Sequence, residues 1–300
     1  MYHQIAANRR KSIIIVVLFL LVWIAGGYVV GYIGGGTAGG VSGAVIGVLL
    51  GLAGMAYSLL FGRATVLALA GARPADPEQY AQLHNIVETL ALGDGLPKPQ
   101  VYVIDDPTPN AFATGLSPKS AAICATTGLL AMMNREELEG VIAHEMSHVR
   151  NHDVRLILIV ATMVGMAALL SSLLWRSMFF SRRSRDDRAV LVVLVAAAVL
   201  TLIGVIVGPL MQLALSRSRE SLADASGVEL TRNPVGLLHA LQKIAQNDKP
   251  LAKSNHATAA MFIDNPMEHH RHWFHDLFDT HPPIEERIAA LEKIAGVQAT

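Results

Sequence analysis

Residues 143–152 read Ala-His-Glu-Met-Ser-His-Val-Arg-Asn-His, and the interpretation of the whole chain starts from this stretch. It contains the pattern H-E-x-x-H, in which His144 and His148 are four residues apart. On an α-helix such positions face the same way, about 6 Å apart along the axis, so both imidazoles can reach one zinc ion. Glu145 is then placed to hold a water on the metal and to accept its proton. The pattern is short and also arises by chance, so its neighbourhood has to decide.

The helix that carries this pattern has a recognisable beginning. Asn134 is a favourable N-cap residue, and Glu137 three residues later completes the sequence of a capping box. Val141, Ile142 and Val149 supply an apolar flank. The sequence therefore predicts a helix that begins after Asn134 and runs through both histidines.

A catalytic zinc ion usually has three protein ligands and a water. His152 continues the spacing, but it lies about 12 Å along the helix axis from His144, which is too far for one ion. The longer pattern H-E-x-x-H-x-x-G-x-x-H is absent, because Asn151 and Val154 take the places of its glycine and last histidine. A carboxylate from a distant helix remains, and Glu220 is the best candidate.

Glu220 has a second acid, Asp224, one helical turn further on. Apolar residues surround the two, so at least one acid is expected to be buried and to need a partner such as a metal ion. The alternative is a pair of solvated acids on an amphipathic helix. Their spacing alone leaves both interpretations open.

The composition indicates a membrane protein. Of the 300 residues 52% are hydrophobic, and the mean hydropathy of +0.41 is too apolar for an ordinary soluble protein. None of the long apolar runs has a charged residue or a histidine in its interior, which argues against an ion channel or a metal transporter. The four runs span residues 13–33, 41–61, 156–175 and 189–215.

Basic residues give the expected orientation. Residues 9–11 (Arg-Arg-Lys) precede the first run, which places the N-terminus in the cytoplasm. An uncleaved anchor fits better than a signal peptide, because the run is long and a second apolar run follows it. Five arginines between residues 176 and 188 conflict with a full crossing by the third and fourth runs. Glycines repeat every four residues from Gly39 to Gly51, and this ridge is expected to pack against the first apolar helix.

Net charge and cysteine content exclude several classes of protein. The formal net charge is zero, so nothing indicates a nucleic acid as partner. Cys124 is the only cysteine, which rules out an internal disulfide and a cysteine-cluster zinc site.

The segment before the H-E-x-x-H helix predicts a helix and a small antiparallel sheet. Asp76-Pro77 is expected to begin the helix and Gly93 to end it. Residues 100–105, 110–115 and 120–126 are expected to be strands. An edge strand beside a zinc site can hold an extended peptide by backbone hydrogen bonds, although a plain structural hairpin is the simpler interpretation.

Four motifs occur in a fixed order along the chain. They are Asn110–Gly115, Glu136–Val149 with the H-E-x-x-H pattern, Arg219–Ala225 and Thr280–Ile288. Together they resemble the HtpX-type membrane zinc metalloproteases, which are relatives of the eukaryotic CaaX-processing zinc endopeptidases. The resemblance covers nearly the whole chain, including its apolar runs.

The resemblance implies a set of functional residues. One Zn²⁺ per subunit would be held by His144, His148 and Glu220, with Glu145 as the general base. Asp224 would accept a hydrogen bond from a ligand imidazole and orient it.

Two further roles follow from the same resemblance. His281 would lie near the substrate carbonyl and stabilise its developing negative charge. A strand would align the substrate, and its residues are Asn110, Ala111, Phe112, Ala113 and Thr114. The histidine-rich stretch 269–275 is not part of the family's motifs and is assigned no role.

The implied fold is α+β and mostly helical: a gluzincin-like zinc metalloprotease domain with a small antiparallel sheet, attached to two transmembrane helical hairpins. The N-terminal tail would lie in the cytoplasm, and each hairpin would precede one half of the protease domain. The expected boundaries are 1–12 for the tail, 13–62 for hairpin 1, 74–155 for the first half, 156–215 for hairpin 2 and 216–300 for the second half.

The implied function is that of an integral-membrane zinc endopeptidase that acts on damaged or misfolded membrane proteins in quality control and stress response, and that can cleave itself. Its expected place is the bacterial cytoplasmic (inner) membrane, as a multi-pass protein whose catalytic domain faces the cytoplasm. Its partners would be polypeptides, chiefly membrane proteins, and the lipid bilayer. Two other classes stay open: a metal transporter or sensor that uses residues 269–275, and a non-catalytic membrane scaffold.

Overall fold

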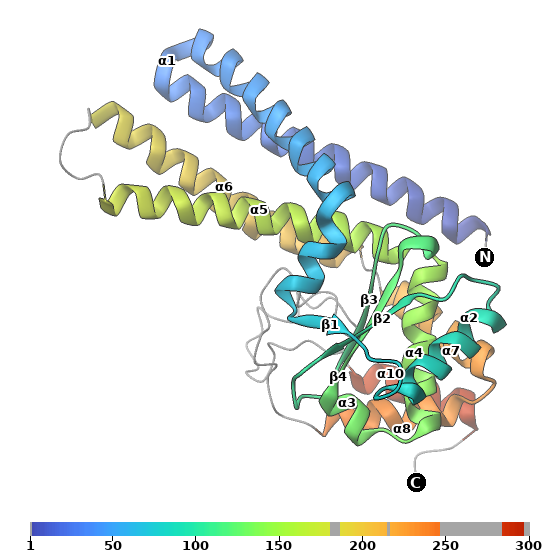
Figure 1. Cartoon of the computed structure of the whole chain (residues 1–300). Helices are drawn as coiled ribbons and strands as arrows, with labels where there is room; N and C mark the ends of the chain where they lie inside the picture. Colours follow the sequence, from blue (N-terminus) through green and yellow to red (C-terminus); the bar gives the residue numbers. More distant parts are fainter. Residues whose placement is uncertain (1, 181–186, 215–216, 247–283, 297–300) are drawn as a thin grey trace. The chain divides into compact units, whose positions relative to one another are not determined.

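The computed structural model divides the chain into two compact units, which are described separately. One consists of Met1–Gly62 with Ile159–Ala214 and is helical, and the other consists of Arg63–Leu158 with Leu215–Thr300 and contains a sheet (Figure 1). The residues that the structure describes are 2–180, 187–214, 217–246 and 284–296.

Helix α1 (Tyr2–Leu69) supplies half of the helical unit and is broken in its middle. Gly35 and Gly36 have φ/ψ angles of −150°/23° and 65°/−153°, which are not helical, and the positive φ of Gly36 favours glycine. The two arms of α1 then lie side by side (Figure 1). Their backbones are so close that a Cβ atom on Gly43 would collide with the backbone carbonyl of Gly27. The predicted packing of the glycine ridge against the first apolar run is confirmed.

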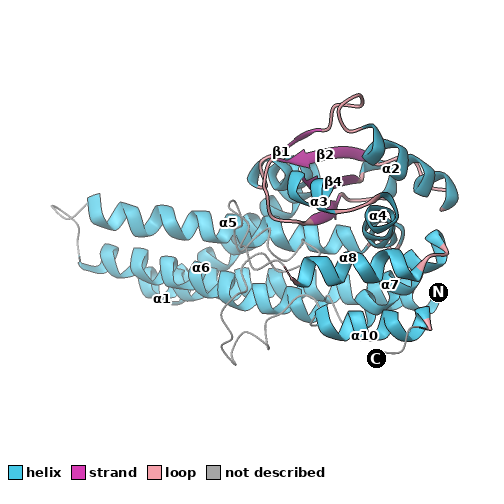
Figure 2. Cartoon of the chain, turned by 90° about the horizontal axis from the view of Figure 1, so that it is seen from below, coloured by secondary structure: helices cyan, strands magenta, loops and turns pink. Residues whose placement is uncertain are grey.

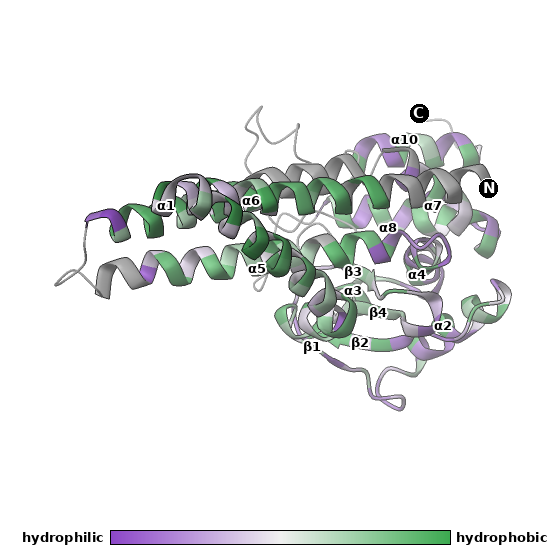
Figure 3. Cartoon of the chain, turned by 90° about the horizontal axis from the view of Figure 1, so that it is seen from above, coloured by the Kyte–Doolittle hydropathy of each residue, from purple (hydrophilic) through white to green (hydrophobic). Residues whose placement is uncertain are grey.

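Two more apolar helices complete the helical unit, α5 (Asp153–Phe180) and α6 (Asp187–Ala214). The Ser171 hydroxyl of α5 donates to the Ala197 carbonyl of α6 at 3.1 Å. The Thr162 hydroxyl of α5 donates to the Ser58 hydroxyl of α1 at 2.6 Å. In the part of the chain that the structure describes, α1, α5 and α6 are the helices long and apolar enough to cross a membrane, judged by length and composition (Figure 3).

The second unit is built around a mixed sheet, so the expectation of a purely antiparallel sheet is wrong. The pairs β1–β2 and β3–β4 are antiparallel, but β2 and β4 run parallel. In spatial order the strands are β1 (Ala72–Pro74), β2 (Gln100–Ile104), β4 (Ala122–Thr126) and β3 (Ala111–Thr114).

The parallel pair follows from the path of the chain. After β2 the chain passes to the far edge and forms β3, and it returns through residues 115–121 to place β4 between the two. The passage is held by Thr126, whose hydroxyl donates to the Thr108 carbonyl at 2.7 Å and accepts from the Asn110 amide at 2.9 Å. Alternation of apolar residues indicates where strands are, but it does not indicate which strands are neighbours.

Helix α4 (Arg135–Arg150) packs against the sheet and carries the H-E-x-x-H pattern (Figure 2). It begins as predicted: the Asn134 side chain accepts from the Glu137 amide, and the Glu137 carboxylate accepts from the Asn134 amide, each at 2.9 Å. The remaining helices surround it. They are α2 (Ala81–Gly93), α3 (Thr127–Met132), α7 (Arg217–Thr231), α8 (Pro234–Ala245) and α10 (Ile284–Ala295), with a 3₁₀ turn at Pro118–Ser120.

Candidate metal centre

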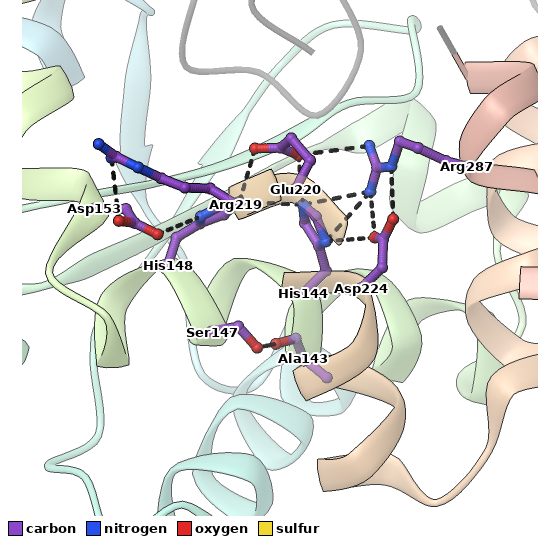
Figure 4. A network of polar contacts seen from close by, with 9 residues as sticks. All are labelled: Ala143, His144, Ser147, His148, Asp153, Arg219, Glu220, Asp224 and Arg287. Atoms are coloured by element: carbon purple, nitrogen blue, oxygen red, sulfur yellow. Dashed lines mark hydrogen bonds and ion pairs between the residues drawn. The ribbon is translucent and has the colours of Figure 1, made fainter. Parts of the chain in front are cut away.

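The two histidines of the pattern converge at the centre of the second unit. His144 and His148 are 0% and 5% exposed, and their Nε2 atoms lie 3.2 Å apart (Figure 4). Glu145 follows His144 on α4 and is also buried, at 3% exposure. One helix therefore brings two imidazoles and a carboxylate into a site from which water is largely excluded.

Helix α7 supplies the third candidate ligand, Glu220, because one of its faces packs tightly on α4. Glu220, Asp224 and Gly227 lie on this face, at helical positions i, i+4 and i+7. A Cβ atom on Gly227 would lie 3.1 Å from the His144 amide nitrogen, so the two backbones are in close contact. This approach brings the first turn of α7 to the histidines.

The Glu220 carboxylate faces both imidazoles. Its Oε2 lies 3.5 Å from His144 Nε2 and its Oε1 lies 3.4 Å from His148 Nε2. Glu220 and Asp224 are 0% and 5% exposed, so the alternative of two solvated acids is wrong. These three residues are also the group in the described chain whose ligand atoms lie close enough together to hold one ion.

The spacing of these atoms fits zinc. A tetrahedral ion with ligands at about 2.0–2.1 Å needs its ligand atoms about 3.3–3.4 Å apart, and the two Nε2 atoms are 3.2 Å apart. The two Glu220 oxygens lie 3.5 and 3.4 Å from His144 Nε2 and His148 Nε2 respectively, and one ligand atom from each of the three residues can be chosen so that all lie within 4.8 Å of one another. Two imidazoles and one carboxylate are a common ligand set for a catalytic zinc ion, which also keeps one position for water. The residues present therefore fit the ion.

Asp224 and Arg287 hold the ring of His144. Asp224 Oδ1 lies 2.8 Å from His144 Nδ1 and accepts a hydrogen bond from it in the tautomer that carries the proton on Nδ1, while Nε2 is directed at Glu220. Arg287 Nη2 lies 3.2 Å from the same Nδ1. Arg287 of α10 binds Asp224 with two donors, Nη2 to Oδ1 at 2.7 Å and Nε to Oδ2 at 3.0 Å. Burial raises the pKa of Asp224, but Arg287 and His144 outweigh it and lower the pKa to about 2.

Asp153 and Arg219 occupy the corresponding place beside His148. Asp153 Oδ2 lies 3.4 Å from His148 Nδ1, and Asp153 Oδ1 accepts from Arg219 Nη1 at 3.1 Å. Burial lowers the pKa of His148, but the carboxylates of Glu220 and Asp153 outweigh it and raise the pKa to about 9. A metal ion that binds Nε2 therefore has to displace a proton from this ring.

The comparison with protein families decides the identity of the chain. The model described as Peptidase family M48 matches residues 77–295. The chain belongs to peptidase family M48. The M48 match includes α4, α7 and α10, which are the three helices that build the site.

Individual M48 relatives are similar along nearly their whole length. Proteins named Protease HtpX homolog are 45% identical in Caldanaerobacter subterraneus subsp. tengcongensis (98% of this chain and 98% of that protein), 43% in Ligilactobacillus salivarius (97% and 99%) and 43% in Streptococcus mutans (98% and 100%). The crystal structure of S. mikatae Ste24p aligns over 82% of this chain and 57% of its own, with a TM-score of 0.49 and 20% identity. The M48 match and the HtpX homologs confirm the expected HtpX-type family, and they and the apolar helices support a membrane-associated protease.

The structure places the other expected site residues as follows. Residues 111–114 form β3, at one edge of the sheet, and the buried Asn110 lies just before it. His152 has left the helix, with a φ of 58°, and is exposed, so it does not join the site. His281 and the stretch 269–275 lie outside the described residues.

Three residues that contact the site were not predicted. Arg219 and Arg287 belong to the third and fourth motifs of this M48 chain, which was the available signal for them. Asp153 follows the helix of the H-E-x-x-H pattern closely, but its role depends on how the chain turns after Asn151, and spacing does not show that.

The close approach of α7 to α4 can be tested at Gly227. We expect Gly227→Val to push the two helices apart and lower the affinity for zinc about tenfold or more, with a smaller effect of Gly227→Ala. Zinc affinity would be measured by competition with a chelating dye in detergent-solubilised protein.

The matched control for Gly227 is Gly140→Ala, because a Cβ there would press on the backbone of Leu237 in α8 and not on α7. This variant should lower thermal stability and leave zinc affinity unchanged. A zinc affinity equal to that of wild type in Gly227→Val would show that the close approach of the helices at Gly227 does not set the position of Glu220.

Proposed function

We propose that this protein is a zinc-dependent endopeptidase with one Zn²⁺ per subunit, held by His144, His148 and Glu220. The single observation that carries the proposal is the convergence of the three buried side chains from two helices, with one ligand atom from each lying within 4.8 Å of the others. Membership in a peptidase family supports the same reaction class.

In the proposed reaction the chain's own residues move the proton. A zinc ion bound here would lower the pKa of a water molecule to about 7 and polarise the scissile carbonyl. Glu145, buried beside His144, accepts the proton of the attacking water and delivers it to the departing amine. Asp224 keeps His144 in the tautomer that presents Nε2. From its motif in the sequence, His281 stabilises the negative charge that develops on the carbonyl oxygen.

We assign substrate alignment to β3. It is the last strand of the sheet and packs against α4, so a peptide along it would run beside the histidines. The Asn110 carbonyl accepts a hydrogen bond from the Thr126 amide of β4. The backbone groups of successive residues in a strand point in alternate directions, so those of Phe112 and Thr114 point toward β4 and those of Ala113 point away from it. On this assignment the backbone groups of Ala113, a residue that is 4% exposed, would pair with an extended substrate.

The apolar helices support a specific cellular role. An active site attached to membrane helices meets proteins with membrane spans at the bilayer, and we propose damaged or misfolded membrane proteins as substrates, with self-cleavage as a further reaction. The basic residues 9–11 support a multi-pass arrangement in the bacterial cytoplasmic (inner) membrane with the catalytic unit in the cytoplasm.

The role of Glu145 is tested by Glu145→Gln. Full-length protein, purified with a chelator and then given Zn²⁺, should cleave itself, and the variant should lose this activity by about 10²-fold or more because glutamine cannot accept the proton. Zinc content should stay at one ion per chain. Metal-dependent proteolysis at the wild-type rate in Glu145→Gln would contradict the mechanism, and so would a wild-type protein that never cleaves any polypeptide.

The role of β3 is tested by Ala113→Pro, which removes an amide donor on the side away from β4. The expected result is an increase in KM for a peptide substrate, or a loss of cleavage, with zinc affinity unchanged. Ala113→Ser retains the amide and is the matched control, expected to behave like wild type. Equal KM values for the proline and serine variants would rule out substrate pairing at this residue.

A further inference from the structure

A buried ion pair lies directly behind one of the proposed metal ligands. Arg219 Nη1 and Asp153 Oδ1 are 3.1 Å apart, and their side chains are 3% and 1% exposed. The other oxygen of Asp153 faces His148 Nδ1 at 3.4 Å (Figure 4). The second ring nitrogen of His148, Nε2, faces Glu220. The pair therefore contacts the ligand ring on the side opposite to the metal position.

This pair is costly to bury, which makes a purely stabilising role a poor explanation. Burying an ion costs several kcal/mol, and an apolar pair of similar volume often serves stability as well or better. Arg219 is satisfied only in part, because its Nε and Nη2 atoms are buried and have no hydrogen-bond partner among the described residues. Burial also lowers the pKa of Arg219, and the neighbouring carboxylates of Asp153 and Glu220 offset only part of this effect.

The pair lies where the chain leaves the sheet-containing unit and where it returns. Asp153 is the first residue of α5, whose continuation from Ile159 belongs to the helical unit. Arg219 lies in the first turn of α7, which follows the return of the chain at Leu215. The pair thus links the two stretches of the sheet-containing unit that precede and follow residues 159–214 in the sequence.

Arg219 also immediately precedes Glu220 in the same helical turn. A contact that fixes Arg219 therefore fixes the start of the backbone that carries the third ligand. Asp153 faces His148 Nδ1 at 3.4 Å, as Asp224 faces His144 Nδ1 at 2.8 Å, and each acid is paired with an arginine. Both pairs have one member on α7, and of the four residues only Asp224 was expected from the sequence.

From this geometry we propose that Asp153 and Arg219 are positioning residues of the metal site. Asp153 orients the ring of His148, and Arg219 fixes Asp153 together with the first turn of α7, which carries Glu220. This inference rests on the proposed function, because it assumes that His144, His148 and Glu220 bind zinc.

The test uses the full-length protein in detergent and measures zinc affinity by competition with a chelating dye at constant pH. Asp153→Ala should weaken zinc binding by about 10- to 100-fold, and Arg219→Gln by about tenfold, since its effect passes through Asp153. Arg219→Lys keeps the charge and should recover part of the loss. In protein loaded with Co²⁺, the visible absorption bands should change in Asp153→Ala and Arg219→Gln, because ligand geometry changes.

Two further variants separate positioning from stability. Asp94→Asn breaks another ion pair, between Arg150 of α4 and Asp94 at 2.6 Å, away from the metal position. It should lower thermal stability without any change in zinc affinity or in the Co²⁺ spectrum. The double variant Asp153→Asn with Arg219→Gln leaves no unpaired buried charge, so it tests the proposal even where a single variant does not fold, and its zinc affinity should stay below that of wild type.

The outcomes separate this inference from the function on which it rests. Zinc affinity and Co²⁺ spectra equal to wild type in Asp153→Ala, Arg219→Gln and the double variant would overturn the positioning role and leave the proposed function standing. If the variant in which His148 and Glu220 are both replaced by alanine binds zinc as tightly as the wild type, the proposed function is overturned, and this inference with it.

Discussion

The whole site depends on the balance of charge in a volume that is largely shielded from water. Four carboxylates and two arginines are buried around the two histidines, so the fixed charges sum to about −2 when the imidazoles are neutral. Two protons on the imidazoles or one divalent cation would restore neutrality, which explains why the pKa values of both histidines are raised. The carboxylates are Glu145, Asp153, Glu220 and Asp224, and the arginines are Arg219 and Arg287.

The fold meets this constraint by bringing together segments that are distant in the sequence. The capped helix α4 holds both histidines on one face, and the glycine contact at Gly227 lets α7 approach closely enough for Glu220 to reach them. Between these helices the chain makes a long apolar excursion, residues 159–214. Tight packing of α7 on α4 brings Glu220 to the two histidines, although residues 159–214 separate the two helices in the sequence.

Much of the site could be predicted from the sequence, because its strongest signals are local. The capping box at Asn134 and the spacing of His144 and His148 depend only on helix geometry, and Glu220 followed by elimination of nearer candidates. Asp224 needed the family resemblance. By contrast, the contact of His148 with Asp153, and that of Asp153 with Arg219, depend on how separate elements meet, which no spacing within one element reveals.

The errors in the fold have the same origin. The sheet is mixed because β4 inserts between β2 and β3, and apolar alternation carries no record of strand order. The three-residue strand β1 is too short to show a pattern. Asp76 does accept hydrogen bonds from the amides of Glu78 and Gln79, at 2.9 and 2.8 Å, but it closes a turn and helix α2 begins only at Ala81.

The central claim is that two imidazoles and the carboxylate of Glu220 bind the same zinc ion. X-ray absorption at the zinc edge, on full-length protein loaded with one equivalent of Zn²⁺, tests it most directly. The account predicts two imidazole ligands with the remaining ligands oxygen, at about 2.0–2.2 Å, and a changed spectrum in Glu220→Ala. A site with three or more imidazoles, or a spectrum that is the same in Glu220→Ala, would contradict it.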